Sequence, residues 1–298
     1  MPDECYTFTP QEQIMSASEI EAIAREFVLL GVNKIRLTGG EPLVRKDFAD
    51  VLSRLAKLNV EILLTTNGLL LHQHIEAIKN AKVSTINVSL DSLKPDSFFQ
   101  ITKRNAFEQV WSNILLLLEN GIRVKINVVA VKEVITQEFL DFIELTRTKP
   151  LHVRFIEFMP FSGNNWSSQD VVTAGQLLDL ASQHYSIIKL LDEPHATARK
   201  YKVVDYQGTF AFITTMSNQF CGECNRVRLT ADGKLKNCLF SKEEADILTA
   251  LRNGQPIAPL ITATIQRKYA ALGGQFQQNY QTIQPQVIIN RSMVGIGG

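Results

Sequence analysis

The first half of the chain alternates between short β-compatible runs and longer segments whose apolar residues recur at helical spacing. Ser16 and Glu19 form the pattern of a capping box, which predicts a helix that Gly31 ends. Asp47 is placed to cap a second helix. Strands are predicted near residues 35, 62, 87, 126 and 155, each separated from the next by a segment of helix length. This βα repeat predicts a parallel sheet with right-handed crossovers.

After Pro160 the pattern changes from this repeat to helices and hairpins. A second capping box, from Ser241 to Glu244, predicts a helix that ends near Arg252. The other predicted elements are a helix at 174–185, a hairpin of 201–206 with 209–214, and a second hairpin of 226–230 with 234–239. We therefore expect an α/β protein in two parts, residues 1–160 and residues 161–298.

Polar residues interrupt the predicted strands or follow their ends. In a buried parallel sheet such residues need a partner or a ligand, and Lys125, between Val124 and Ile126, should face an acidic group. The residues within strands are Lys125, Asn127, Arg154 and Glu157, and those at the carboxyl ends are Gly39, Gly40, Glu41, Thr65, Ser89, Asp91 and Met159. Because barrels place their chemistry at that end, an open or closed barrel is favoured over a flat doubly wound sheet.

Three cysteines, Cys221, Cys224 and Cys238, have the spacing C-x2-C-x13-C. If the second hairpin turns at Asp232-Gly233, Cys238 returns opposite Arg226 or Val227 and lies near the other two thiols. Three thiolates with one coordination position open favour an iron–sulfur cluster over structural zinc, which prefers a fourth ligand, and over free thiols. Arg226 and Arg228 leave one strand face together, so the pattern indicates a metal centre beside an anion site.

Composition and charge exclude some functions. The 298 residues are 45% hydrophobic and 20% charged, with a net charge of +1, so bulk charge does not indicate a nucleic-acid or membrane partner. The longest apolar run, Ile114 to Leu118, is too short to cross a bilayer. Four cysteines without an export signal at Met1 to Glu4 lead us to expect a cytoplasmic, reduced protein.

These motifs, taken in order, resemble those of the GTP 3′,8-cyclase (MoaA) family, radical S-adenosylmethionine enzymes that open molybdenum cofactor biosynthesis. The matching stretches are Lys34 to Leu43, Leu64 to Gly68, Ile86 to Asp91, Val153 to Met159, Cys221 to Leu229, Asp232 to Leu239, and Gly297-Gly298. The resemblance covers nearly the whole chain. It implies a partial (β/α)6 barrel that lacks its first strand here, with a C-terminal α+β extension carrying an iron–sulfur site.

The resemblance also implies site residues and cofactors. The family holds two 4Fe–4S clusters, of which the C-terminal one would be bound here by Cys221, Cys224 and Cys238. By the same resemblance, GTP would contact Arg36, Thr65, Lys125, Arg226 and Arg228, and S-adenosylmethionine would contact Gly40, Ser89 and Met159. The terminal Gly297 and Gly298 resemble the catalytic tail that reaches the active site, although a Gly-Gly end by itself is typical of a disordered tail.

One family motif is absent. The family's C-x3-C-x2-C sequence, which binds the S-adenosylmethionine cluster, does not occur in these 298 residues, and Cys5 cannot replace three ligands. We therefore expect an N-terminally incomplete chain that is inactive as written. Alternatives are a non-catalytic GTP-binding iron–sulfur protein and a zinc-stabilised α/β module. The implied partners are GTP and, downstream, cyclic pyranopterin monophosphate synthase, and a homodimer is one candidate assembly.

Overall fold

The computed structural model describes residues 9–276, 279–284 and 290–296. Its largest feature is an eight-stranded sheet with the order β1-β2-β3-β4-β5-β8-β7-β6. The strands are β1 (Lys34–Leu37), β2 (Glu61–Thr66), β3 (Thr85–Ser89), β4 (Arg123–Ala130), β5 (His152–Glu157), β6 (Ile187–Lys189), β7 (Ala198–Val203) and β8 (Thr209–Ile213). Neighbours from β1 to β5, and then β5 with β8, pair in parallel, whereas β7 pairs antiparallel with both β8 and β6. The predicted parallel βα sheet is confirmed.

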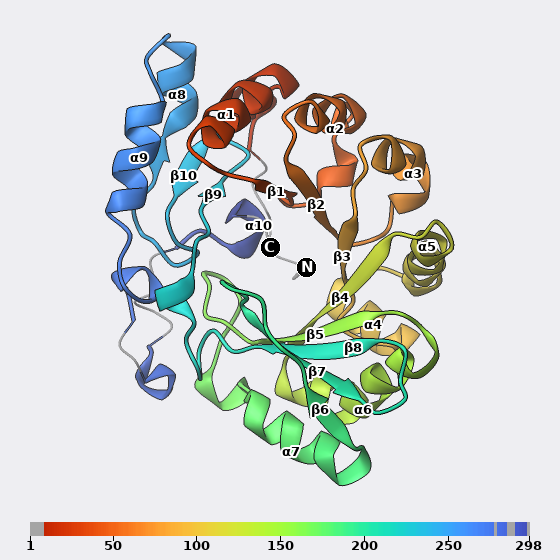
Figure 1. Ribbon diagram of the computed structural model, residues 1–298. Coiled ribbons are helices and arrows are strands. Elements are labelled where there is room, and N and C mark those ends of the chain that lie inside the picture. Colours follow the sequence, from red (N-terminus) through yellow and green to blue (C-terminus); the bar gives the residue numbers. More distant parts are fainter. Residues whose placement is uncertain (1–8, 277–278, 285–289, 297–298) are drawn as a thin grey trace.

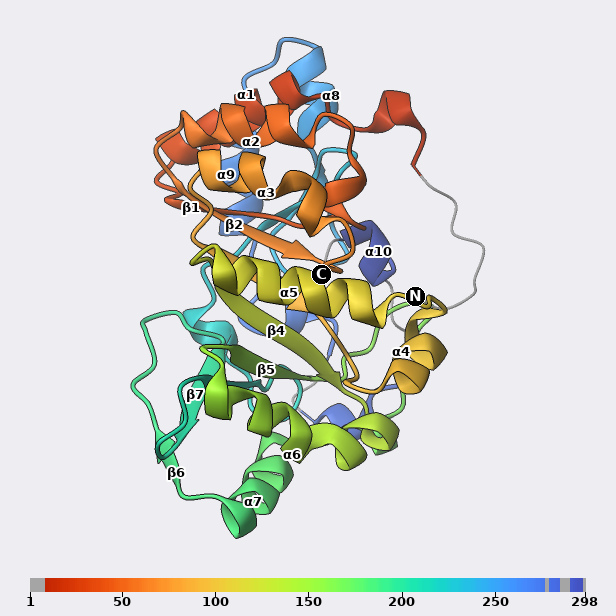
Figure 2. The same cartoon turned by 90° about the vertical axis from the view of Figure 1, so that its right-hand side faces the viewer.

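Helices cover the outer face of this curved sheet (Figure 1). They are α1 (Ala17–Leu29), α2 (Phe48–Ala56), α3 (Leu71–Asn80), α4 (Pro95–Thr102), α5 (Phe107–Glu119), α6 (Lys132–Thr148) and α7 (Ala174–His184). The main hydrophobic core joins these helices to the outward-facing residues of the strands. Figure 2 shows α2, α3 and α5 one after another over the strands that they connect.

The inner face of the sheet is different in character. Along β4 and β5 buried residues alternate with half-buried ones, except that Arg123 at the start of β4 is exposed. On β4 the half-buried set includes Lys125 and Asn127, and on β5 it includes His152 and Arg154. Side chains of alternate strand residues point to opposite faces, so the concave face is polar and water reaches it. A filled barrel core would have apolar residues there.

The C-terminal part lies beside β1 and partly closes the ring (Figure 1). It contains β9 (Arg228–Leu229), β10 (Lys234–Lys236), β11 (Ala245–Asp246), α8 (Ile247–Arg252), α9 (Ala258–Gln266) and α10 (Met293–Ile296). The pairs Leu235–Leu229 and Lys236–Arg228 set the hairpin register. The strands are shorter than predicted, but their register, continued by two residues, would place Cys238 opposite Arg226, one of the two positions that the sequence predicts.

Helix starts were predicted with mixed success. Ser16 and Glu19 form both hydrogen bonds of a capping box. Asp47 precedes α2 but does not cap it, because Arg45 binds its carboxylate. The predicted box at Ser241 is wrong: Asp246 caps α8 by accepting from Thr249, and Glu244 pairs with cations elsewhere.

No helix in the described part of the chain is long and apolar enough to cross a membrane.

Candidate active site

Five cationic side chains from two distant parts of the chain gather on the concave side. We call Arg36, Lys125, Arg154, Arg226 and Arg228 the concave-face cations. Their charges act on one another: Arg36 is affected by Arg226 and Arg228, Lys125 by Arg154 and Arg36, and Arg154 by Arg36 and Arg226. The structure therefore brings together four of the predicted GTP contacts and adds Arg154.

These cations depress one another's proton affinity. Enclosure by protein, followed by the charges of Arg154 and Arg36, lowers the pKa of Lys125 to about 8. Enclosure and like charges also lower the pKa values of Arg36 and Arg154. No ion pair among the described residues includes Arg36, Lys125, Arg154 or Arg226. Clustered like charges without counter-ions are costly, so the geometry favours an anionic ligand.

Neutral side chains hold part of this set in place. The Arg36 Nη1 donates to Thr65 Oγ1 at 3.5 Å, and Asn87 Nδ2 donates to the same oxygen at 3.1 Å. The Arg154 Nη2 donates to Asn127 Oδ1. The Nε of Arg154 and the Oδ1 of Asn87 are buried without a hydrogen-bond partner. Buried polar atoms of this kind are uncommon, and a polar ligand in the concavity would satisfy them.

The turn after β1 is tied to the end of β2. Glu41 accepts from Thr66 Oγ1 and from the Asn67 backbone, each at 2.7 Å, and from the Leu43 backbone at 3.1 Å. Gly39 has a φ of 94°, a left-handed conformation that favours glycine. This linkage sets Gly40 and Thr65 at neighbouring strand ends. Glu41 therefore has a structural role that the sequence did not reveal.

The residues predicted to contact S-adenosylmethionine occupy three places. Gly40 follows β1 and Ser89 ends β3, and both are exposed. Met159 follows β5 and packs against the small buried cluster that contains Phe161 and Phe240, and Cys221 and Cys238 pack against the same cluster. All three lie at the carboxyl ends of parallel strands, where the sequence placed them.

The three cysteine thiols are free of disulfide bonds and half-buried. Burial raises the pKa of Cys238, and the nearby Cys221 and Cys224 raise it further, while Lys268 opposes them. The Lys268 Nζ lies 3.5 Å from Cys224 Sγ, and the Leu272 backbone N–H lies 3.5 Å from Cys221 Sγ. The hairpin thus brings the three thiols into one region, with N–H donors aimed at two of the sulfurs.

These thiols fit an iron–sulfur cluster by their chemistry. Within the described residues, no three His, Cys, Asp or Glu side chains could hold a single metal ion as they stand. A four-iron cluster binds each thiolate through a different iron, so its ligand sulfurs stand farther apart than those around one ion. N–H donors to sulfur are a feature of such sites. The ligand set therefore stays a prediction.

Near the other end of the chain, Arg291 forms a charged network with the cysteine hairpin. Its guanidinium donates to both carboxylate oxygens of Asp232 at 3.0 Å and to Glu244. Glu244 also accepts from the buried Lys236 at 3.2 Å. We call these four residues the Arg291 network. Ile296, in α10, is buried with Phe161 and Phe240 beside Cys221 and Cys238. The predicted tail residues Gly297 and Gly298 lie outside the described residues.

Sequence reasoning missed several residues of this region. Of the four polar residues predicted within strands, which include Arg154, the sequence assigns only Lys125 to the ligand. Glu157, another of the four, accepts from the Met216 and Ser217 backbones at 2.8 and 2.9 Å and holds that loop. Lys268 carried no motif at all. The alternation on β5 could have identified Arg154, whereas Lys268 could be found only from the folded chain.

Comparisons with known proteins agree with these motifs. Residues 4–146 match the model of the radical SAM superfamily, and residues 151–272 match that of Molybdenum Cofactor Synthesis C. The chain is 39% identical over its full length to "GTP 3′,8-cyclase, mitochondrial" of Arabidopsis thaliana, covering 76% of that protein. It is also 39% identical to "GTP 3′,8-cyclase" of Desulforamulus reducens, over 90% of this chain and 85% of that protein.

Some relatives are much longer. "Molybdenum cofactor biosynthesis protein 1" of Mus musculus is 40% identical over 97% of this chain, but the chain covers only 46% of that protein. The chain thus spans about half the length of such relatives. Those in Arabidopsis and Desulforamulus match over most of both lengths. From its motifs, its site and these relatives, the chain belongs to the GTP 3′,8-cyclase family of radical SAM proteins.

Proposed function

We propose that this protein serves as a GTP 3′,8-cyclase, converting GTP to (8S)-3′,8-cyclo-7,8-dihydroguanosine 5′-triphosphate in molybdenum cofactor biosynthesis. The observation that carries the proposal is the set of concave-face cations, which face the polar side of the sheet. A nucleoside triphosphate supplies the several negative charges that such a set requires. The family membership supplies the reaction class.

Each cation has a defined place around the triphosphate. Arg36 and Lys125 reach it from the sheet, and Arg226 and Arg228 reach it from the cysteine hairpin. Arg154 joins them from β5, with Asn127 fixing its guanidinium. Thr65 holds Arg36 and borders the same space. The sheet and the cysteine hairpin thus bind the same ligand from two sides, and this orients the ligand between the sheet and the thiols.

Cys221, Cys224 and Cys238 would hold a 4Fe–4S cluster. When bound by three thiolates, such a cluster supplies one iron open to a ligand atom. Gly40, Ser89 and Met159 would bind S-adenosylmethionine at the carboxyl ends of their strands. A second cluster belongs to the family's chemistry, and its C-x3-C-x2-C ligands are not among these 298 residues.

The finer architecture belongs to the same proposal. The curved sheet corresponds to a partial (β/α)6 barrel without its first strand, with residues 1–160 as the radical SAM part and 161–298 as the cluster- and GTP-binding part. Strand β8, which pairs with β5, joins the two parts in one sheet. Gly297 and Gly298 would act as the catalytic tail. A cytoplasmic location, a homodimer and product transfer to cyclic pyranopterin monophosphate synthase complete the proposal.

A second candidate is a GTP-binding iron–sulfur protein that performs no chemistry. The absence of C-x3-C-x2-C from these 298 residues favours it. Incubation without oxygen, with GTP, S-adenosylmethionine and a strong reductant, separates the two, because only the enzyme forms 5′-deoxyadenosine. We expect none from the 298 residues alone, and formation when a segment carrying C-x3-C-x2-C is fused in front. Normal rates from residues 1–298 would require another ligand set for the radical-generating cluster.

The direct test of the site combines metal analysis with ligand binding. Protein made without oxygen should hold about four iron and four sulfide per chain. Serine at Cys221, Cys224 and Cys238 together should abolish both. GTP should bind to the intact protein, and inorganic sulfate should compete weakly. Stoichiometric zinc without iron in protein kept anaerobic would refute the cluster, and failure to bind GTP would refute the substrate.

A further inference from the structure

The segment that follows α9 wraps around the three cysteine thiols. Lys268 lies against Cys224, and the Leu272 N–H points to Cys221 Sγ. Gly273 packs so tightly on the chain after Cys238 that an added Cβ would lie 2.5 Å from the Phe240 carbonyl carbon. Gln275 donates to the Phe240 carbonyl. One short segment, residues 268–275, therefore touches the surroundings of all three thiols.

Lys268 is the charged member of this segment, and its ammonium group has a defined position. It donates to the Cys224 carbonyl at 2.7 Å and to the Arg226 carbonyl at 3.1 Å, with Cys224 Sγ at 3.5 Å. Three acceptors match the three donors of an ammonium group. The side chain therefore binds the loop between Cys224 and Arg226, which joins a predicted cluster ligand to a predicted GTP contact.

We infer that Lys268 is a positioning residue that holds the cysteine loop and raises the reduction potential of the cluster bound there. The inference rests on the proposed cluster. Reduction adds an electron to a centre already surrounded by thiolates. A nearby positive charge and an N–H donor to a ligand sulfur both favour the more negative state. Cluster potentials depend on such hydrogen bonds and on local charge.

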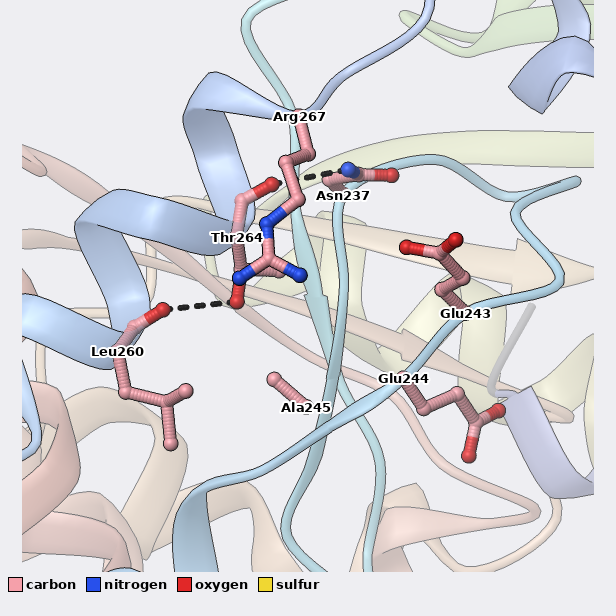
Figure 3. Close-up of a pocket in the computed structure, with 7 residues that line it drawn as sticks. All are labelled: Asn237, Glu243, Glu244, Ala245, Leu260, Thr264 and Arg267. Carbon is pink, nitrogen blue, oxygen red and sulfur yellow. Dashed lines mark hydrogen bonds between the residues drawn. The ribbon is translucent and has the colours of Figure 1, made fainter.

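The adjacent residue offers a matched control. Arg267 carries the same charge one position earlier and is exposed, and among the described residues no hydrogen bond joins it to the thiols. Figure 3 shows its guanidinium directed into a separate cavity lined by Asn237, Glu243, Glu244, Ala245, Leu260 and Thr264. Arg267→Met and Lys268→Met therefore make the same change in net charge, but only the second removes contacts with Cys224.

The test measures potential and cluster retention in anaerobically prepared protein. A redox titration monitored by electron paramagnetic resonance should show a more negative cluster potential in Lys268→Met than in the wild type. The expected change is about tenfold in the oxidised-to-reduced ratio at a given potential, or about 59 mV for a one-electron couple. Iron release to a chelator should be several-fold faster. Arg267→Met should match the wild type in both measurements, and Lys268→Arg should keep most of the potential.

Each outcome has one meaning. Lys268→Met with wild-type potential and iron release would overturn the inference, and so would equal shifts in Lys268→Met and Arg267→Met. If Lys268→Met assembles no cluster, retention of iron by Lys268→Arg supports the inference, and failure of both variants overturns the role of the charge. Wild-type protein without iron would instead refute the proposed cluster, so the two failures are distinguishable.

Discussion

The concave-face cations and the Arg291 network contain similar charged groups in opposite settings. In the network, Arg291 and Lys236 meet Asp232 and Glu244 within hydrogen-bond distance. On the concave face, positive groups influence mainly one another, and burial and like charge lower their pKa values. Paired charges stabilise the fold they connect, whereas like charges gathered in one place, as at Arg36, Lys125 and Arg154, raise its energy until a ligand arrives. The comparison therefore assigns structure to one group and ligand binding to the other.

The largest expected effect is on GTP affinity. Contacts to charged groups contribute about 1.5–3 kcal/mol each, so Lys125→Ala or Arg228→Ala should weaken binding about tenfold or more. Both changes together should approach a hundredfold loss. Arg25→Met, at an exposed ion pair with Glu21, is the control and should bind normally. Isothermal titration with GTP measures this, and unchanged affinity in both single variants would remove these residues from the site.

Arg291 should behave in the opposite way. Arg291→Met removes the ion-pair partner of Asp232 and leaves Glu244 with Lys236 alone, so the free energy of unfolding should fall by about 2 kcal/mol. Affinity for GTP should change less than in Lys125→Ala. Urea unfolding measures the loss, and Arg252→Met is the control, since Arg252 pairs with Glu19 at the surface. Equal losses in the two variants would mean that the Arg291 network stabilises the fold no more than an exposed ion pair does.

A third effect concerns pH. The pKa of Lys125 lies near 8 in the protein without ligand, so its ammonium group loses its proton above that pH. A phosphate ligand needs the charged form, so GTP affinity should be level below about pH 7 and fall about fivefold between pH 8 and pH 9. Lys125→Arg keeps its charge and should show a flatter profile. A wild-type profile as flat as that of the arginine variant would contradict the placement of Lys125.

Local patterns in the sequence predicted the elements well where neighbours in sequence decide them. The Ser16 capping box formed, and the cysteine hairpin has the expected register. Prediction failed where a basic side chain bound the carboxylate that was expected to cap the helix. Arg45 took the carboxylate of Asp47, and Lys236 and Arg291 took that of Glu244, so neither acid caps the predicted helix. Arg45 lies two positions before Asp47, so that competitor was visible in the local sequence, whereas Arg291 reaches Glu244 only on folding.

The same reason limits prediction of the site. Lys125 was recognisable because a lysine in an apolar strand needs a partner, and Arg154 obeys the same rule one strand away. By contrast, β8 pairs in parallel with β5, and no periodic pattern in the sequence of either strand identifies the other as its partner. Lys268 lies 44 positions after Cys224, and only folding brings it there. Family resemblance supplied roles for motif residues, but it was silent on these supporting contacts.

The smallest expected effect is on the stability of the protein without GTP. Replacing Lys125 with Met removes a charge that its neighbours repel, so the free energy of unfolding at pH 7 should rise by about 0.5–1 kcal/mol. The control, Lys57→Met at the exposed end of α2, should change little. Urea unfolding of both variants without GTP measures the gain.

The pH dependence of this gain identifies its cause. In the unfolded chain Lys125 keeps its proton up to its ordinary pKa of 10.5, whereas in the folded protein it loses the proton from about 8. Between these values the unfolded state binds more protons, so wild-type stability rises with pH. Lys125→Met lacks this contribution, so its advantage should shrink as pH increases from 8 to 10.

Saturating GTP should reverse the order at pH 7, because the ligand stabilises the wild type more strongly. A methionine variant less stable than the wild type at pH 7 without GTP would show that Lys125 has a counter-charge, and the contrast with the Arg291 network would fail at that residue.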